Sequence, residues 1–141
     1  MRRRRVVLDT NVIVAAFKSR EGASFALLSL FAEQRFEVAI SVPLVLEYED
    51  ALNRRLQGSV TADDIEAFLD YICQAAHRQS IFFLWRPCLP DAKDDMVLEL
   101  AFAAGCDGIV THNQRDFAGA ERFGIRVYSP RDFLRSMEEK P

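Results

Sequence analysis

The stretch Val6-Val7-Leu8-Asp9-Thr10-Asn11 decides how the rest of the chain is interpreted. Three consecutive apolar residues without polar alternation are typical of a strand that is buried on both faces of a parallel sheet. Asp9 follows this run directly, so it should lie at the carboxyl end of the strand. In open α/β sheets, ligands bind beyond the carboxyl ends of the strands.

Strands and helices are expected to alternate along the rest of the chain. Apolar runs predict the strands, and capped amphipathic segments predict the helices between them. The expected strands are 6–8, 36–41, 80–85, 108–111 and 125–128, and the expected helices are 11–17, 23–33, 43–56, 61–78, 91–104 and 130–137. This alternation favours a single α/β domain over residues 1–141, a three-layer α/β/α sandwich with a central parallel sheet of about five strands.

The composition is that of a folded domain with a real hydrophobic core. Of the 141 residues, 50% are hydrophobic and 28% are charged, and the net charge is −3. This length suits one domain, and this share of apolar residues excludes a disordered chain. A net negative charge argues against a generally basic nucleic-acid coat, but a metal site would tolerate it because bound cations reverse the local field.

Targeting signals and cysteines point to a protein that remains in the cytoplasm. No apolar run approaches the roughly 20 residues of a membrane span, and Asp9 interrupts the apolar stretch that follows Arg2 to Arg5. The three cysteines are Cys73, Cys88 and Cys106, with no C-x-x-C pair. We therefore expect reduced thiols, without a disulfide framework or a zinc site.

Acidic and amide side chains gather at four places, and each place has an ordinary structural explanation. The residues are Asp9 and Asn11 after the first strand, Glu47 and Glu49 in helix 43–56, Asp91, Asp94 and Asp95 at the start of helix 91–104, and Asn113 and Asp116 after the fourth strand. Aspartates can cap a helix or complement its dipole, and a glutamate can lie on a solvated helix face. Periodicity does not choose between Glu47 and Glu49.

The combination of the four places predicts more than capping does. Three acids within Asp91–Asp95 exceed what a helix start needs, and without neutralisation they would raise one another's pKa. A doubly wound sheet could bring all four places into one cleft. Several oxygen ligands in one cleft suit a hard divalent cation such as Mg²⁺.

These same segments resemble the motifs of the PIN-domain family, especially the VapC-type toxins of bacterial toxin–antitoxin systems. The matching segments, in the family's order, are Val6–Val12, Ser41–Leu52, Asp91–Ala101 and Ile109–Phe117. The first motif is moderately specific, and the pair D-x-x-D and V-T-x-N-x-x-D-F is more so. The resemblance covers nearly the whole chain.

The resemblance implies a metal-dependent endoribonuclease that hydrolyses RNA phosphodiester bonds with Mg²⁺ or Mn²⁺. It implies that four acids bind the metal and carry catalysis, namely Asp9, Glu47, Asp94 and Asp116. Residues expected to support them are Asn11, Asp91, Asp95, Thr111 and Asn113. Glu47 is preferred to Glu49 because of its spacing to Leu52, and Asn113 stands where many members have Asp.

The resemblance also implies macromolecular partners. The expected partners are the RNA substrate, a small antitoxin protein that masks the cleft, and a second copy of the chain in a homodimer. Arginines that could hold RNA phosphates are Arg2 to Arg5, Arg54, Arg55, Arg115 and Arg122. Arg115 is the preferred RNA-binding residue because it lies beside the expected site.

The sequence also has features in common with three other kinds of domain. A receiver-like signalling domain shares the alternating pattern, but the chain has no Lys after its last strand, where it reads Ile125 to Pro130. A phosphatase with a D-x-D start would need an aspartate in place of Asn11. A degenerate PIN-like domain that binds RNA without cutting it stays open because of Asn113.

Overall fold

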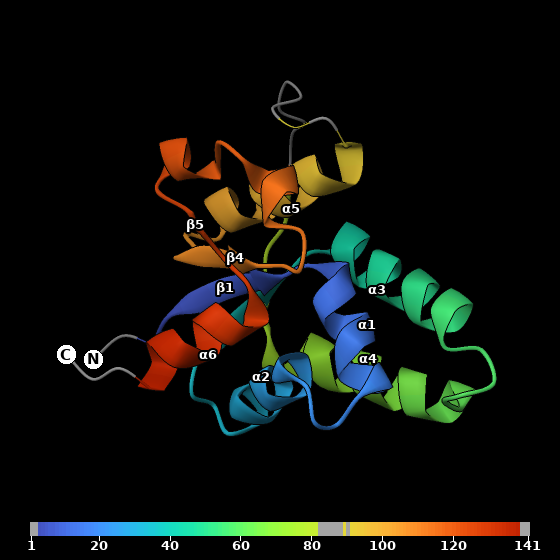
Figure 1. The fold of residues 1–141 in the computed structure, drawn as a ribbon. Coiled ribbons are helices and arrows are strands. Elements are labelled where there is room, and N and C mark those ends of the chain that lie inside the picture. The colour runs from blue at the N-terminus through green and yellow to red at the C-terminus, as the bar shows by residue number, and fades with distance from the viewer. Residues whose placement is uncertain (1–2, 82–88, 90, 139–141) are drawn as a thin grey trace.

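A five-stranded sheet in which every strand is parallel forms the centre of the molecule (Figure 1). This computed structural model describes residues 3–81, 89 and 91–138. The strands are β1 (Arg5–Leu8), β2 (Glu37–Ile40), β3 (His77–Arg78), β4 (Gly108–Val110) and β5 (Arg126–Tyr128), and their order in the sheet is β3-β2-β1-β4-β5. Residues 6–8 of the central strand are fully buried, as their apolar run predicted.

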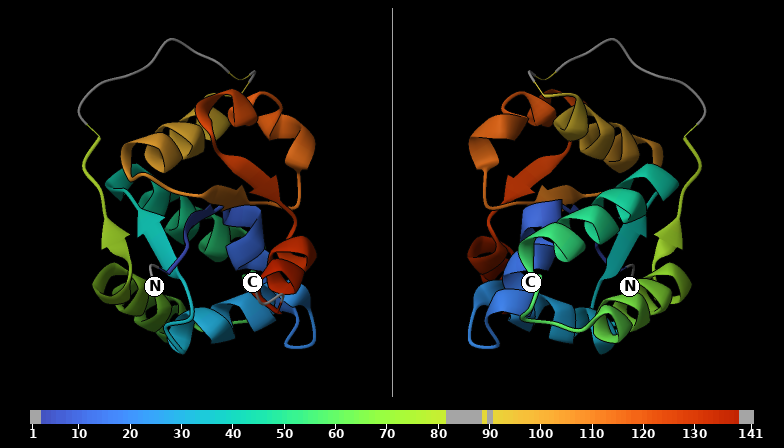
Figure 2. Two further views of the ribbon diagram at one scale, coloured as in Figure 1. Left: turned by 90° about the vertical axis from the view of Figure 1, so that its left-hand side faces the viewer. Right: turned by 90° about the vertical axis from the view of Figure 1, so that its right-hand side faces the viewer.

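Helices cover both faces of this sheet, so the expected three-layer α/β/α arrangement is confirmed. The helices are α1 (Thr10–Lys18), α2 (Ala23–Ala32), α3 (Val42–Arg55), α4 (Ala62–Ala75), α5 (Ala92–Ala103) and α6 (Pro130–Glu138), with two 3₁₀ helices, η1 (Gln114–Phe117) and η2 (Ala120–Phe123). Figures 1 and 2 show α5, η1 and η2 above the sheet, and α1, α2, α4 and α6 below it. Right-handed crossovers explain this division, because the chain runs outward from β1 to β3 and then returns to β4.

The third strand differs from its prediction. The strand that pairs with β2 is His77–Arg78, in register with Ala39 and Ile40, whereas the sequence predicted helix over these residues and a strand at 80–85. Helix α4 already ends at Ala75, positions 80 and 81 are not in a strand, and positions 82–85 lie outside the described residues. The main-chain ladder holds β3 at the edge of the sheet, so its polar side chains carry no apolar signal.

The other four strands and the α-helices except α4 begin and end within one or two residues of their predicted bounds, and no bounds were predicted for η1 and η2. The strand order separates this fold from a receiver-like domain. Here β1 lies between β2 and β4. In receiver-like sheets, the first strand lies between the second and the third, so the receiver interpretation is wrong.

Helix α3 is attached firmly to the end of the central strand. Ser41 caps its N-terminus by accepting a hydrogen bond from the Leu44 N–H, and Pro43 occupies the first turn, where proline is tolerated. The fully buried Tyr48 donates its hydroxyl to the carbonyl oxygen of Leu8 at 2.5 Å. This bond sets the rotation of α3 relative to the residue that follows β1.

Among the described residues, no helix is long and apolar enough to cross a membrane.

Candidate active site

A cleft of about 190 Å³ opens beyond the carboxyl ends of β1 and β4, and its wall contains the four acids expected to act together. Asp9 follows β1, Glu47 comes from α3, Asp94 comes from the first turn of α5, and Asp116 comes from η1. The expected supporting residues Asn11, Asp91 and Asn113 also line the cleft. The fold therefore brings together side chains from four segments that are far apart in the sequence.

Asp9 is held in one orientation by two hydrogen bonds. Its Oδ1 accepts from the Thr10 N–H at 2.9 Å, and its Oδ2 accepts from the Thr111 hydroxyl at 2.7 Å. Burial raises the pKa of Asp9; the two hydrogen bonds oppose this, and the charges of Asp116 and Glu47 add to it. Asp9 thus caps α1, as the ordinary explanation requires, and also presents its carboxylate to the cleft.

Thr111 joins the two loops that end β1 and β4. This fully buried residue donates its hydroxyl to Asp9 and accepts from the Asn11 Nδ2 at 3.4 Å and from the Asn113 N–H at 3.0 Å. Asn113 precedes η1 without a side-chain capping bond, so capping does not explain its amide. Thr111 lies beneath the cleft wall, where it can orient a carboxylate but cannot touch a ligand directly.

The structure distinguishes Glu47 from Glu49. Glu47 lines the cleft and its side chain is 20% exposed, whereas Glu49 lies on the exposed side of α3, away from the cleft wall. The buried Tyr48 between them determines which of its two neighbours faces the cleft. Lys93 reaches Glu47 from α5, with Nζ 3.4 Å from Oε1.

The three acids at the start of α5 have separate roles in the structure. Asp91 caps the helix by accepting from the Lys93 N–H at 2.8 Å, and Asp95 accepts from the Leu89 N–H at 3.0 Å. Asp94 faces the cleft, where burial and the negative charges of Asp9 and Asp116 raise its pKa to about 6. Asp91 also borders the cleft, while Asp95 is not part of its wall.

Two cations stand on the wall of this acidic cleft. They are Arg55 from the last turn of α3 and Lys93 from α5. Lys93 was not among the predicted site residues, although it is the cation within the acidic run Asp91–Asp95. The predicted RNA contact Arg115 lies in a neighbouring hollow formed by His112–Asp116.

The donor set fits a divalent cation that keeps part of its water shell. Among the residues that the structure describes, no three Asp, Glu, His or Cys side chains converge as a ready-made ligand cage. Mg²⁺ is usually bound through one or two carboxylates and several waters, so carboxylates on the wall of an open cleft suit it. A cation there would also relieve the repulsion that helps to raise the pKa of Asp9 and Asp94.

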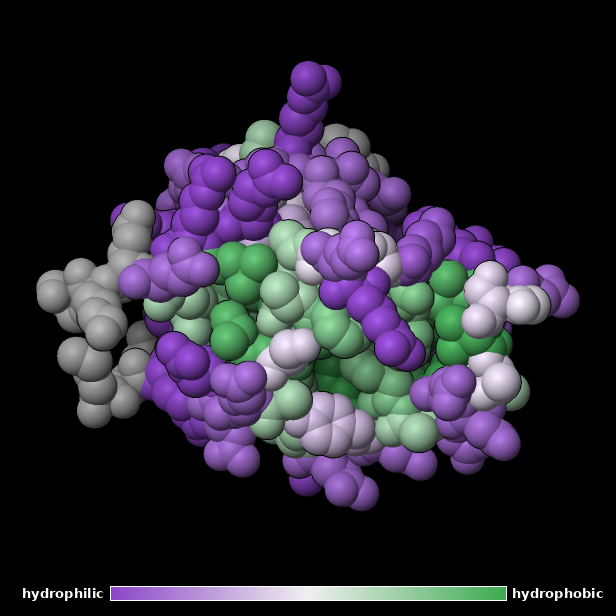
Figure 3. Space-filling model, turned by 60° about the horizontal axis from the view of Figure 1, so that its bottom comes forward, coloured by the Kyte–Doolittle hydropathy of each residue, from purple (hydrophilic) through white to green (hydrophobic). Residues whose placement is uncertain are grey.

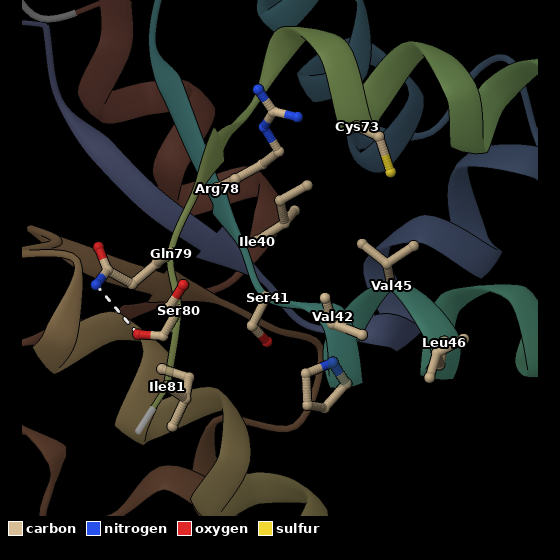
Figure 4. Close-up of a pocket in the computed structure, with 11 residues that line it drawn as sticks. Ile40, Ser41, Val42, Val45, Leu46, Cys73, Arg78, Gln79, Ser80 and Ile81 are labelled. Atoms are coloured by element: carbon tan, nitrogen blue, oxygen red, sulfur yellow. Dashed lines mark hydrogen bonds between the residues drawn. The ribbon is translucent and has the colours of Figure 1, made fainter. Parts of the chain in front are cut away.

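A larger hollow of about 520 Å³ lies between α3, α4 and the chain after β3, and its chemistry is different (Figure 4). Its walls are mainly apolar, with Ile40, Val45 and Leu46 around it, and Arg78 is the cation among its described lining residues. No described residue of this wall is a carboxylate. The hollow therefore offers no oxygen ligands for a metal, and the acidic cleft is the candidate active site.

Comparison with known proteins supports one family. A sequence model described as the PIN domain matches residues 5–115, a region that includes Asp9, Glu47 and Asp94 and ends one residue before Asp116. A chain in the crystal structure of VapBC2 from Rickettsia felis, bound to a DNA fragment from their promoter, has the same fold. It aligns with a TM-score of 0.57 and 16% identity over 89% of this chain and 98% of that chain. A search of curated proteins found no match. Because the PIN-domain model matches well over half of its residues, this chain belongs to the PIN-domain family.

Proposed function

We propose that the protein is an endoribonuclease that hydrolyses RNA phosphodiester bonds in the acidic cleft with the help of Mg²⁺ or Mn²⁺. The supporting observation is that four carboxylates from four separate segments line one cleft of a PIN domain, namely Asp9, Glu47, Asp94 and Asp116. Bonds to main-chain N–H groups at the start of α5 account for Asp91 and Asp95, and Lys93 pairs with Glu47, but capping explains neither Asp94 nor Asp116.

Each cleft residue has a task in this hydrolysis. A bound divalent cation would lower the pKa of the attacking water and offset the negative charge of the phosphate. Asp9, Glu47, Asp94 and Asp116 would hold the cation, some directly and the others through its bound waters. Thr111 would keep the Asp9 carboxylate aimed at the cleft. The oxygen of a water molecule would form the new bond to phosphorus and give up a proton to solvent. The leaving ribose oxygen would take up a proton from solvent as its bond to phosphorus breaks. No covalent enzyme intermediate is required.

The test compares cleavage of mixed single-stranded RNA by the natural protein and its variants in Mg²⁺, in Mn²⁺ and in EDTA. We expect Asp9→Asn, Glu47→Gln and Asp94→Asn each to lower the rate about a hundredfold or more. Glu49→Gln is the matched control, because it makes the same chemical change one residue beyond Tyr48 on the exposed side of α3. A folded natural protein that cuts no RNA, or cleft variants as active as Glu49→Gln, would refute the proposal.

A domain that binds RNA without cutting it is the second candidate, because an amide, Asn113, stands on the cleft wall where many relatives have a carboxylate. Binding of RNA without metal-dependent cleavage would identify this case. An Asn113→Asp variant makes the distinction sharper, since it would restore the missing carboxylate. Cleavage by this variant alone would show that the natural chain is a degenerate nuclease.

We also propose that the chain is the toxin of a toxin–antitoxin pair, that a small antitoxin masks its cleft, and that it forms a homodimer. The fold shared with the VapBC2 structure supports this, as does an apolar face of the molecule. Figure 3 shows hydrophobic residues gathered in a hollow on the side that carries α2 and α4, where Phe25 is 37% and Tyr71 43% exposed. The sequence offers four further apolar side chains for such contacts, Leu28, Phe31, Phe82 and Phe83. Leu28 is partly buried, Phe31 belongs to the core, and positions 82 and 83 lie outside the described residues. Light scattering of the purified chain, alone and with a co-expressed neighbouring gene product, tests both partners.

A further inference from the structure

His112 is held beside the acidic cleft from two sides. Its ring Nε2 forms a hydrogen bond with the Ser24 hydroxyl at 3.0 Å, and its main-chain N–H donates to the Asn11 Oδ1 at 3.2 Å. Ser24 is only 3% exposed in the first turn of α2, and Asn11 belongs to the cleft wall. An exposed histidine thus has both its backbone and its ring fixed.

The same histidine opens a second hollow that adjoins the cleft. This hollow has a volume of about 420 Å³ and is lined by His112, Asn113, Gln114, Arg115 and Asp116. Asn113 and Asp116 also line the acidic cleft, so the two cavities share a wall. A group bound in the hollow would therefore lie directly beside a group bound in the cleft.

The chemistry of the hollow suits a nucleobase better than a phosphate. The Arg115 guanidinium and the Asp116 carboxylate are close in sequence and opposite in charge, which leaves little net positive charge to attract a phosphate. Imidazole and guanidinium groups offer flat faces on which unpaired bases stack, whereas bases inside a duplex are already stacked on each other. Amides such as Asn113 and Gln114 can bond to the edge of a base.

We propose that this hollow holds the unpaired nucleobase beside the scissile phosphate, with the His112 ring as its stacking platform. Ser24 is the positioning residue that keeps the ring in place. This inference rests on the proposed ribonuclease function and adds a base-binding hollow next to the acidic cleft.

The experiment measures binding of a short single-stranded RNA that carries a fluorescent adenine analogue, whose emission is quenched by stacking. Ca²⁺ replaces Mg²⁺ as the oxygen-ligated cation to suppress cleavage. His112→Ala should weaken binding about tenfold and remove the quenching. His112→Phe keeps a flat ring but loses the bond to Ser24, so it should restore both only to the level of Ser24→Ala. Ser24→Ala should give an intermediate loss.

The matched control is His77→Ala on the edge strand β3. The Nε2 of His77 has a similar hydrogen bond, to Gln79 at 3.1 Å, and the variant should bind RNA as the natural protein does.

Salt dependence separates stacking from phosphate binding. A stacking contact releases no counterions, so His112→Ala should leave the slope of log K against log salt unchanged. The inference is overturned if His112→Ala binds like His77→Ala, if His112→Phe binds no better than His112→Ala, or if His112→Ala makes the salt-dependence slope shallower. A natural protein that binds no RNA overturns the proposed function as well, whereas metal-dependent cleavage with unaltered binding in His112→Ala overturns only the base-binding hollow.

Discussion

Thr111 is the residue on which the orientation of Asp9 depends. Its hydroxyl is fully buried, donates to Asp9 and accepts from Asn11 and Asn113, so all of its bonding capacity is used within the site. Replacing it by an apolar side chain of similar shape would leave the partly buried carboxylate of Asp9 with only one of its two donors. A missing partner costs more than the bond itself contributes, because the remaining group stays desolvated.

We therefore expect Thr111→Val to lower the free energy of unfolding by about 1–3 kcal/mol. Thr111→Ser keeps the hydroxyl and should recover most of this loss. Urea denaturation of the two variants in EDTA measures the difference. Equal stabilities for the valine and serine variants would show that the hydroxyl does not support the folded state.

Asp94 makes the metal-free protein less stable as its carboxyl ionises. Its pKa is raised to about 6 in the folded state, against roughly 3.9 in an unfolded chain, so the folded state binds this proton more tightly. The stabilising contribution is complete below about pH 4 and is lost as the pH rises towards about 6. Above that pH, the ionised side chain repels its acidic neighbours.

Asp94→Asn should consequently stabilise the metal-free protein at pH 7, by about 1 kcal/mol once solvent screening of this partly exposed group is allowed for. The advantage should disappear near pH 4. Thermal melts in EDTA between pH 4 and pH 8 provide the measurement, with Asp50→Asn, at an exposed ion pair of α3, as the control. A variant less stable than the natural protein at pH 7 would contradict this account of the cleft.

At the scale of elements, the close approach of β4 and β5 supports the loop that carries Asn113 and Asp116. Gly108 begins β4, and a Cβ at this position would lie 2.8 Å from the Arg126 carbonyl oxygen and 2.7 Å from the Tyr128 ring. The two strands could accept a side chain only by moving apart. The sheet therefore requires glycine at this register position because of space, since its φ is not in the left-handed region.

Gly108→Ala is expected to destabilise the protein by about 2–3 kcal/mol, within the usual cost of overpacking. Gly22→Ala is the matched control, because the atoms nearest to its added Cβ lie 3.9 Å away, and it should change stability by less than about 0.5 kcal/mol. Chemical denaturation compares the two variants. Similar stabilities would mean that β5 moves away from β4 without lowering the free energy of unfolding.

At the scale of the whole molecule, charge in the cleft links folding to metal binding. The acids meet only when β1, α3, α5 and η1 are packed together, so the unfolded chain has no equivalent site. A cation that binds only the folded state stabilises it by about 2.7 kcal/mol at a concentration of 100 times Kd.

The natural protein should therefore melt roughly 5–10 °C higher in saturating Mn²⁺ than in EDTA. Asp9→Asn and Asp94→Asn should lose most of this gain, whereas Glu49→Gln should keep it. Differential scanning calorimetry provides the comparison. An equal gain in all four proteins would mean that Mn²⁺ binds elsewhere.

The local pattern of the sequence determined most of the fold. The buried run before Asp9 and the capped helices were predicted correctly. A strand buried on both faces is a continuous apolar run, and a helix start is marked by a capping residue such as Asp or Ser, so both can be recognised from adjacent residues. The predicted position of the third strand was wrong because this strand has no such local signal. At the edge of the sheet, β3 is held by main-chain pairing with β2, and the side chains of His77 and Arg78 do not reveal that pairing.

Only the tertiary structure decided which side chains meet. Sequence motifs identified the four acidic segments, and their catalytic role remains a prediction. The family resemblance already favoured Glu47 and Asp94. The tertiary structure adds the physical reason: the Tyr48 bond to Leu8 fixes the rotation of α3, and bonds to main-chain N–H groups engage Asp91 and Asp95. Lys93 on Glu47 and Ser24 on His112 were not predicted, because each contact joins residues 46 or 88 positions apart. Such contacts arise from packing in three dimensions, which the periodicity of a single segment does not encode.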